Sequence, residues 1–103
     1  TEIKNESIQL PKIHEQATSV WHQFVVRTKR RDELIEYLNS KEIGTIIHYP
    51  VPPHLSEAYE YLGVKKGDLP ITEQLANEIL SIPLYNGMSF EEQTYVIDAI
   101  NEF

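Results

Sequence analysis

Three prolines within four positions, Pro50, Pro52 and Pro53, constrain the fold of this chain more than any other feature. Proline has a fixed φ, lacks a backbone N–H and disfavours helical backbone in the residue before it, so neither a helix nor a central strand can run through them. The surrounding segment, residues 48–54, reads His-Tyr-Pro-Val-Pro-Pro-His and also carries two imidazoles and a phenol. We predict a stiff loop that presents polar rings, which is typical of a segment that contacts a ligand.

The composition indicates one compact domain. The chain has 103 residues, of which 41% are hydrophobic, and this is enough apolar material for a single core. It contains no cysteine, which excludes a disulfide framework, a thiolate metal site and a cysteine nucleophile, and we expect a cytoplasmic protein. No apolar run approaches the roughly 20 residues that cross a bilayer, so membrane insertion is not expected. The formal net charge of −7, without a basic stripe, argues against nucleic acid as a partner.

Side-chain patterns predict short strands before and between helices. Residues 20–27 are rich in aromatic and β-branched side chains and predict a central strand. Residues 8–11 predict an edge strand that ends at proline. Residues 45–47 predict a strand that leads into the proline loop, and residues 81–84 predict a last extended segment.

Four helices are predicted from caps and apolar periodicity. They run from Thr28 to about Lys41, over residues 55–62, from Asp68 to about Ile79, and from Ser89 to the end of the chain. Thr28, Asp68 and Ser89 are predicted N-caps, and Ser89 begins a Ser-x-x-Glu capping box. Gly63 is expected to end the second helix, and Pro70 suits the first turn of the third.

Each predicted helix has an apolar stripe expected to face the core. The stripes are Leu34, Ile35 and Leu38; Leu55, Ala58, Tyr59 and Leu62; Ile71, Leu75 and Ile79; and Val96, Ile97, Ile100 and Phe103. The order of elements predicts an α+β fold, in which a small, mostly antiparallel sheet has helices packed mainly on one face.

The residues alone suggest binding rather than catalysis. His48, Tyr49 and His54 are candidates for ligand contact because they share the stiff loop. His22, within an apolar strand, is commonly a histidine held by one hydrogen bond, although His22, His48 and His54 together could also ligate a metal. No nucleophile elbow, no glycine-rich phosphate loop and no self-contained catalytic group of residues is present.

Several segments, in this order and spacing, resemble one protein family. They are residues 20–27 (VWHQFVVR), 31–34 (RDEL), 44–45 (GT), 48–54 (HYPVPPH) and 80–85 (LSIPLY). Together they resemble the C-terminal small domain of pyridoxal-phosphate-dependent sugar aminotransferases of the DegT/DnrJ group. The resemblance runs from about residue 19 to residue 103. It assigns these residues to the small domain and residues 1–18 to a linker or edge segment.

The resemblance implies a function and a site. It implies a fold-type I aminotransferase, a transaminase that moves an amino group, usually from glutamate, onto a keto sugar carried by a nucleotide diphosphate. Such enzymes serve deoxyamino-sugar or polysaccharide biosynthesis and act as homodimers. The resemblance implies that His48, Tyr49 and His54 line the mouth of the active site and bind the sugar or its phosphates. His22 matches a family position near the same pocket.

The resemblance also implies that the cofactor, pyridoxal 5′-phosphate (PLP), is bound outside this chain. In the family, the Schiff-base lysine and its neighbours belong to a large N-terminal domain of the same polypeptide, and none of the lysines here lies in a matching motif. We therefore expect no catalytic residue, no bound cofactor and no metal in this chain, and no activity from it in isolation.

Two alternatives stay open at this point. One is a stand-alone, small α+β ligand-binding module, since such folds serve many functions. The other is an interaction domain whose acidic surface meets a basic partner. The chain begins at Thr1 rather than at a methionine, which favours a domain cut from a longer protein. Such a domain should leave an apolar patch uncovered where the large domain docks.

Overall fold

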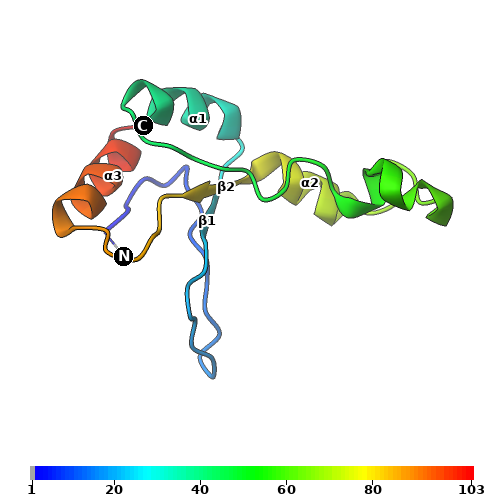
Figure 1. Ribbon diagram of the computed structural model, residues 1–103, viewed down its shortest axis with the longest axis horizontal. Helices are drawn as coiled ribbons and strands as arrows, with labels where there is room; N and C mark the ends of the chain where they lie inside the picture. The colour runs from blue at the N-terminus through cyan, green and yellow to red at the C-terminus, as the bar shows by residue number, and fades with distance from the viewer. Residues whose placement is uncertain (1) are drawn as a thin grey trace.

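The computed structural model describes residues 2–103 (Figure 1). In chain order, the elements are β1 (Phe24–Arg27), α1 (Arg31–Ser40), the 3-10 helices η1 (Pro53–Leu55) and η2 (Glu57–Leu62), α2 (Pro70–Glu78), β2 (Ile79–Ile82) and α3 (Phe90–Glu102). The sheet, α1 and α3 form a central body, from which two parts project (Figure 1). One is the hairpin segment, residues 11–22, and the other is the arm, residues 48–78, which contains η1, η2 and α2. The radius of gyration is 15.6 Å, larger than the roughly 13 Å of a compact domain of this length.

The sheet is small and antiparallel, as predicted. β1 pairs with β2 so that Val26 lies opposite Leu80. Side chains alternate across a strand, and the buried Val26, Leu80 and Ile82 share one face of the sheet. A single bridge extends each edge, from Gln9 to β1 and from Ile46 to β2.

The predicted strand boundaries were partly wrong. The strand predicted over residues 20–27 begins only at Phe24, because the hydrogen-bonded pairing with β2 begins there. Val20, which precedes the paired segment, is 96% exposed. The segments 8–11 and 45–47 each contribute only one bridge. β2 begins at Ile79, which was predicted to end a helix, because its backbone pairs with Arg27 of β1.

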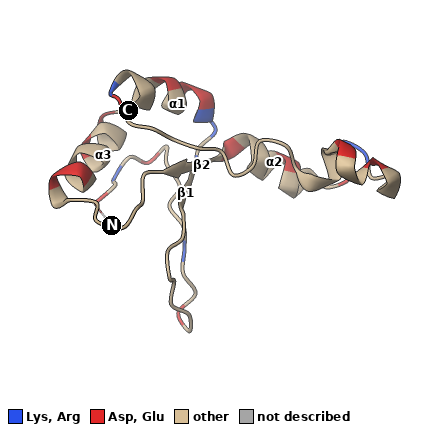
Figure 2. Ribbon diagram, viewed as in Figure 1, with Lys and Arg blue, Asp and Glu red and all other residues tan. Residues whose placement is uncertain are grey.

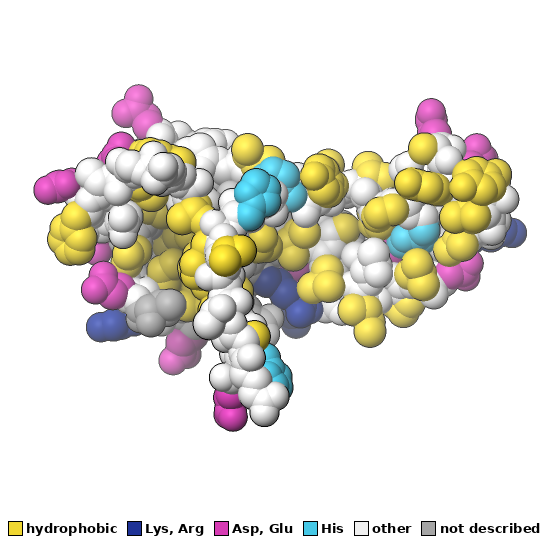
Figure 3. Space-filling view, turned by 60° about the horizontal axis from the view of Figure 1, so that its bottom comes forward, with side chains coloured by type: hydrophobic (Ala, Val, Ile, Leu, Met, Phe, Trp, Pro, Cys, Tyr) yellow, Lys and Arg dark blue, Asp and Glu magenta, His cyan; other side chains and the backbone are white. Residues whose placement is uncertain are grey.

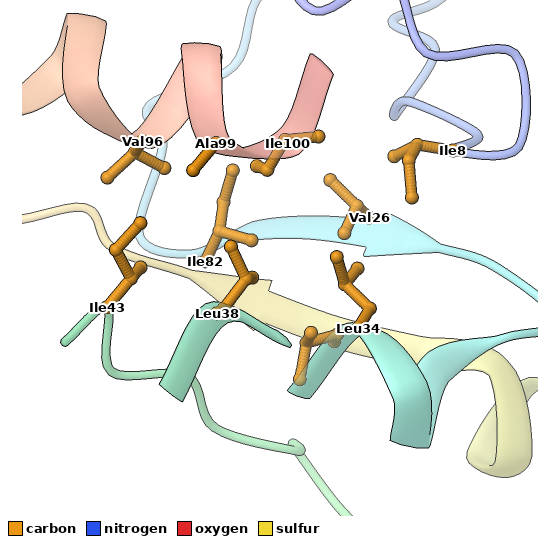
Figure 4. Close-up of a cluster of buried hydrophobic side chains, with 10 residues drawn as sticks. Ile8, Val26, Leu34, Leu38, Ile43, Ile82, Val96, Ala99 and Ile100 are labelled. Atoms are coloured by element: carbon orange, nitrogen blue, oxygen red, sulfur yellow. The ribbon is translucent and has the colours of Figure 1, made fainter. Parts of the chain in front are cut away.

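The core lies between the sheet and the two helices α1 and α3 (Figure 4). Its buried members are Ile8, Val26, Leu34, Leu38, Ile43, Leu80, Ile82, Val96, Ala99 and Ile100. Leu34 and Leu38 of α1, and Val96 and Ile100 of α3, come from the predicted stripes. Full burial of such a side chain contributes roughly 1.5–3 kcal/mol, which is why these two helices are well formed. The predicted α+β fold, with helices on one face of the sheet, is confirmed for the central body.

The two helices of the central body begin differently. At α3 the predicted capping box is confirmed: the Ser89 hydroxyl accepts from the Glu92 N–H at 3.1 Å, and the Glu92 carboxylate accepts from the Ser89 N–H at 2.7 Å. At α1 the prediction was wrong, because Arg30 is the N-cap residue and no side chain caps the helix. The Thr28 hydroxyl instead accepts from the Arg30 N–H at 3.2 Å and closes a turn before the helix.

The arm departs most from the sequence-based prediction. Residues 55–62 do not form one α-helix, because Ser56 is extended and separates η1 from η2. Gly63 ends η2 in the left-handed conformation, as predicted. α2 begins at Pro70, but Asp68 does not cap it; the Asp68 carboxylate accepts from the Lys65 N–H at 2.8 Å in the preceding turn.

Much of the apolar surface of the arm is exposed. Figure 3 shows hydrophobic side chains gathered over this part of the molecule. Tyr59, Leu62 and Ile71, which were predicted to face the core, are exposed, and Ala76 is the buried residue of α2. Short helices owe most of their stability to packing, so an uncovered face explains why 3-10 turns replace the predicted α-helix here.

Charged side chains are dispersed, with acidic groups on all three α-helices (Figure 2). Two arginines attach the base of the arm to the central body: Arg27 pairs with Glu78, and the Arg31 guanidinium donates to the Ala76 carbonyl at 2.6 Å. No helix within residues 2–103 combines the length and the apolar character needed to cross a membrane.

Candidate functional site

The predicted loop, residues 48–54, starts at the edge of the sheet. The backbones of Ile46 and Ser81 exchange two hydrogen bonds, of 3.1 and 2.8 Å, so the chain enters the loop directly beside β2. The peptide bond between His48 and Tyr49 is cis. The loop then runs through irregular backbone to η1, which begins at Pro53. The prolines therefore lie outside regular strands and α-helices, as predicted.

His48 is attached to β2 through Ser81. Its Nδ1 lies 2.8 Å from the Ser81 hydroxyl oxygen, and Ser81 is itself buried on the sheet face that points away from Leu80 and Ile82. Either group can donate this hydrogen bond, depending on the histidine tautomer. The contact holds the imidazole against a rigid strand at the beginning of the loop.

His54 is attached to α2 at the other end of the loop. It is only 8% exposed, and its Nε2 lies 3.1 Å from the Glu73 carboxylate. The hydrogen bond from His54 and a further one from the Gly67 N–H lower the pKa of Glu73 below its usual range. The carboxylate is therefore ionised at neutral pH and can only accept, so His54 Nε2 carries the proton of this bond.

Tyr49 and Val51 lie between these two attachments and face solvent. Tyr49 is 74% exposed, and its ring stands edge-on to that of His48, with 5.6 Å between the ring centroids. Two fixed histidines thus present a phenol outward on proline-stiffened backbone. An imidazole and a phenol in this arrangement can hydrogen-bond hydroxyl or phosphate oxygens of a ligand.

His22 lies on the hairpin segment and is exposed. The neighbouring Trp21 packs on Phe24 of β1, with 5.1 Å between the ring centroids. Within residues 2–103, the His48 side chain hydrogen-bonds to Ser81 and that of His54 to Glu73, and neither bonds to His22. The described residues contain no group of three or more acidic, histidine or cysteine side chains that could hold a metal.

An open hollow lies at the foot of the loop. It has a volume of about 440 Å³ and is lined by Gly44, Thr45, Ile46, Ser81, Ile82, Pro83, Leu84 and Tyr85. A second, more apolar hollow of about 500 Å³ shares Pro83, Leu84 and Tyr85 and extends to Trp21 and Phe24. Volumes of this size are typical of sites for small molecules. Ile46, which precedes the loop, and Ser81, which holds His48, thus both border concave surface.

Lys41 lacks the properties of a lysine that anchors PLP covalently. A Schiff-base lysine needs a lowered pKa to be nucleophilic at neutral pH. Lys41 shows the opposite: hydrogen bonds with Glu102, 2.9 Å away, and with Tyr37 raise its pKa. Its ammonium group is thus held in the charged, unreactive form.

Sequence reasoning missed Ser81 and Glu73, the two partners of the loop histidines. Ser81 carries a usable signal, because it is a polar residue inside the apolar run Ile79-Leu80-Ser81-Ile82. Glu73 carries none, because a carboxylate in the first turn of a helix is common and nothing nearby in sequence points to His54.

Comparison with known proteins covers almost the whole chain. The dTDP-3-amino-3,6-dideoxy-α-D-galactopyranose transaminase of Aneurinibacillus thermoaerophilus is 42% identical over 101 residues, which is 98% of this chain and 27% of that protein. The crystal structure of S. venezuelae DesV in complex with a ketimine intermediate is 43% identical, with a TM-score of 0.89 over 93% of this chain and 26% of that one. NtdA from Bacillus subtilis, with bound cofactor PMP, is 26% identical, with a TM-score of 0.75 over 94% of this chain and 23% of that one.

This chain thus spans about a quarter of the length of the relatives it matches. The high TM-scores show that its central body, hairpin segment and arm occur together as one part of larger aminotransferases. A model of one family matches residues 1–101, and the chain belongs to that family, the DegT/DnrJ/EryC1/StrS aminotransferases.

Proposed function

We propose that this chain is the C-terminal small domain of a PLP-dependent transaminase that transfers an amino group from glutamate to a nucleotide-linked keto sugar. The family membership and the relatedness to a dTDP-amino-sugar transaminase support the reaction class. The single observation that carries the role of this chain is the loop itself: His48 is held on Ser81, which also lines an open hollow, and Tyr49 is exposed next to His48.

The cofactor would be held by the rest of the protein. The ammonium group of Lys41 is paired and its pKa is raised, which supports a covalent anchor for PLP outside this chain. Bound PMP in NtdA supports a PLP-type cofactor for the larger protein. The part played by this chain is to bind and orient the sugar nucleotide, which requires hydrogen-bonding groups on a rigid frame rather than a nucleophile.

The four predicted residues have different places in this proposal. His48 and Tyr49 would contact the substrate; the proposal is supported by His48 being fixed on the sheet and by Tyr49 being exposed next to it. His54 is buried against Glu73 and supports the loop from below. His22 is exposed on the hairpin segment. It would contact a ligand only where the ligand, or a part of the protein that carries it, approaches the hairpin segment.

The wider organisation follows from the same proposal. Residues 1–18 would lead from the large PLP-binding domain of the same polypeptide, residues 19–103 would form the small domain, and the whole enzyme would act as a homodimer. The exposed apolar side chains of the arm, among them Leu62 and Ile71, support contact with such a partner. Because its substrates are sugar nucleotides, the enzyme would work in the cytoplasm, in deoxyamino-sugar or polysaccharide biosynthesis.

The proposal is tested on the full-length protein that contains this chain. Purified with PLP, it should aminate a dTDP-linked keto sugar with glutamate and release 2-oxoglutarate. Tyr49→Phe removes only the exposed hydroxyl and should raise the KM for the sugar nucleotide roughly tenfold, the effect of losing one charge-assisted hydrogen bond to phosphate. His48→Ala should raise it at least as much.

Tyr61→Phe is the matched control, because Tyr61 is an equally exposed tyrosine on the arm, outside the loop. It should leave the KM unchanged. If the wild-type protein transfers no amino group to any keto-sugar nucleotide, the enzymatic proposal fails. If it does so and the Tyr49 and His48 variants behave like Tyr61→Phe, the loop has no role in substrate binding.

A further inference from the structure

The carboxylate of Glu73 joins three segments that are separate in sequence. It accepts from His54 Nε2, at the end of the proline loop, at 3.1 Å. It also accepts from the Gly67 N–H, at 2.8 Å to one oxygen and 3.0 Å to the other. Glu73 itself lies in the first turn of α2. The proline loop, the turn after η2 and α2 therefore meet at one side chain.

We infer that Glu73 is a positioning residue for substrate binding: through His54 it fixes the proline loop that presents His48 and Tyr49. This inference rests on the proposed function of the loop. Glu73 does not line the hollow formed by residues 44–46 and 81–85.

The geometry favours positioning over general stabilisation. His54 and Glu73 are both largely covered, with side-chain exposures of 6% and 14%, so water competes little for their hydrogen bond. Within residues 2–103, the bond to Glu73 is the only side-chain hydrogen bond at the far end of the loop, whereas its near end is held by the Ser81 hydroxyl and by backbone pairing of Ile46. Glu73 lies in α2 of the arm, which projects from the central body (Figure 1) and contributes no residue to the buried core cluster. Loss of its contacts should therefore loosen the loop without unfolding the central body.

The test uses the full-length enzyme with Glu73→Gln and Glu73→Ala. Glutamine keeps an oxygen for the Gly67 N–H but lacks the charge that His54 Nε2 meets, so its effect should lie between wild type and alanine. We expect the KM for the sugar nucleotide to rise about threefold in Glu73→Gln and about tenfold in Glu73→Ala, with kcat and the KM for glutamate unchanged. His54→Asn should raise the KM similarly, and combining it with Glu73→Gln should add little, because both act through one contact.

Glu60→Gln is the control, because Glu60 is an exposed carboxylate of η2 in the same arm. Hydrogen exchange of the Leu55 amide gives a readout that does not need activity: this N–H donates to the Pro52 carbonyl at 2.9 Å at the far end of the loop, and its exchange should speed up in Glu73→Gln and not in Glu60→Gln. An unchanged KM and unchanged exchange in a wild type that transaminates would overturn the inference and leave the proposed function standing. Faster exchange with no transamination by the wild type would overturn the proposed function and, with it, the role of Glu73 in binding.

Discussion

The capping box at the start of α3 gives the sharpest test of how this chain folds. The Ser89 hydroxyl accepts from the Glu92 N–H at 3.1 Å, and Ser89→Ala removes this bond alone. The reciprocal bond, from the Ser89 backbone N–H to the Glu92 carboxylate at 2.7 Å, needs no side chain at position 89 and is kept. Loss of such a cap costs about 1 kcal/mol of unfolding free energy. In a domain of this size that lowers Tm by roughly 4–8 °C.

Thr94→Ala is the matched control for this prediction. It also removes a hydroxyl from the same helix, but the Thr94 hydroxyl bonds to the Phe90 carbonyl at 2.9 Å inside the helix, where alanine has the higher propensity. Thr94→Ala should leave Tm unchanged or raise it slightly. Thermal unfolding of the 103-residue chain, with hydrogen exchange of the Glu92 amide as a local probe, distinguishes the two variants. Equal Tm shifts in both, or continued protection of the Glu92 amide in Ser89→Ala, would refute the capping argument.

Three further predictions follow from single side chains. Leu38→Ala should lower the unfolding free energy by roughly 2–5 kcal/mol in urea titration, because Leu38 is fully buried between α1 and the sheet, and a loss below about 1 kcal/mol would contradict this packing. The pKa of Glu92 is lowered, first by its hydrogen bond with the Ser89 backbone, so the stability it contributes is present above the unfolded-state pKa and is lost as the pH falls through the lowered folded-state pKa. Glu92→Gln should thus be less stable than wild type at pH 7 and equal to it in acid, as measured by urea titration across pH; a difference that persists in acid would argue against this linkage. Lys41→Met in the full-length protein should leave the bound PLP content, measured by absorbance, unchanged, because the Lys41 ammonium is paired with Glu102; loss of PLP would overturn our view of that lysine.

Local patterns predicted the central body well, because its elements depend on neighbours that are close in sequence. The stripe of Leu34 and Leu38 marks the buried face of α1, and it was found where expected. The Ser89 cap needs only a partner three residues on. The proline loop was predicted for the same reason, because each proline restricts its own backbone and that of the preceding residue whatever the rest of the chain does.

The arm was predicted less well, because its secondary structure depends on what covers it. Tyr59 and Leu62 have the spacing of a helix stripe, yet both are exposed and the backbone there is 3-10. Ile79 continues the apolar period of α2 but is extended, because pairing with Arg27 of β1 satisfies its backbone. In each case a contact distant in sequence, or its absence, outweighed local propensity.

The sequence by itself determined the two packed helices, the α3 cap and a rigid loop bearing polar rings, since these follow from short-range periodicity and proline geometry. Only the tertiary structure decided what holds that loop. His48 meets Ser81, which is 33 positions later, and His54 meets Glu73, which is 19 positions later. Such hydrogen bonds form because β2 and α2 carry their partners back beside the loop, and no local pattern records which distant side chains a folded chain brings together.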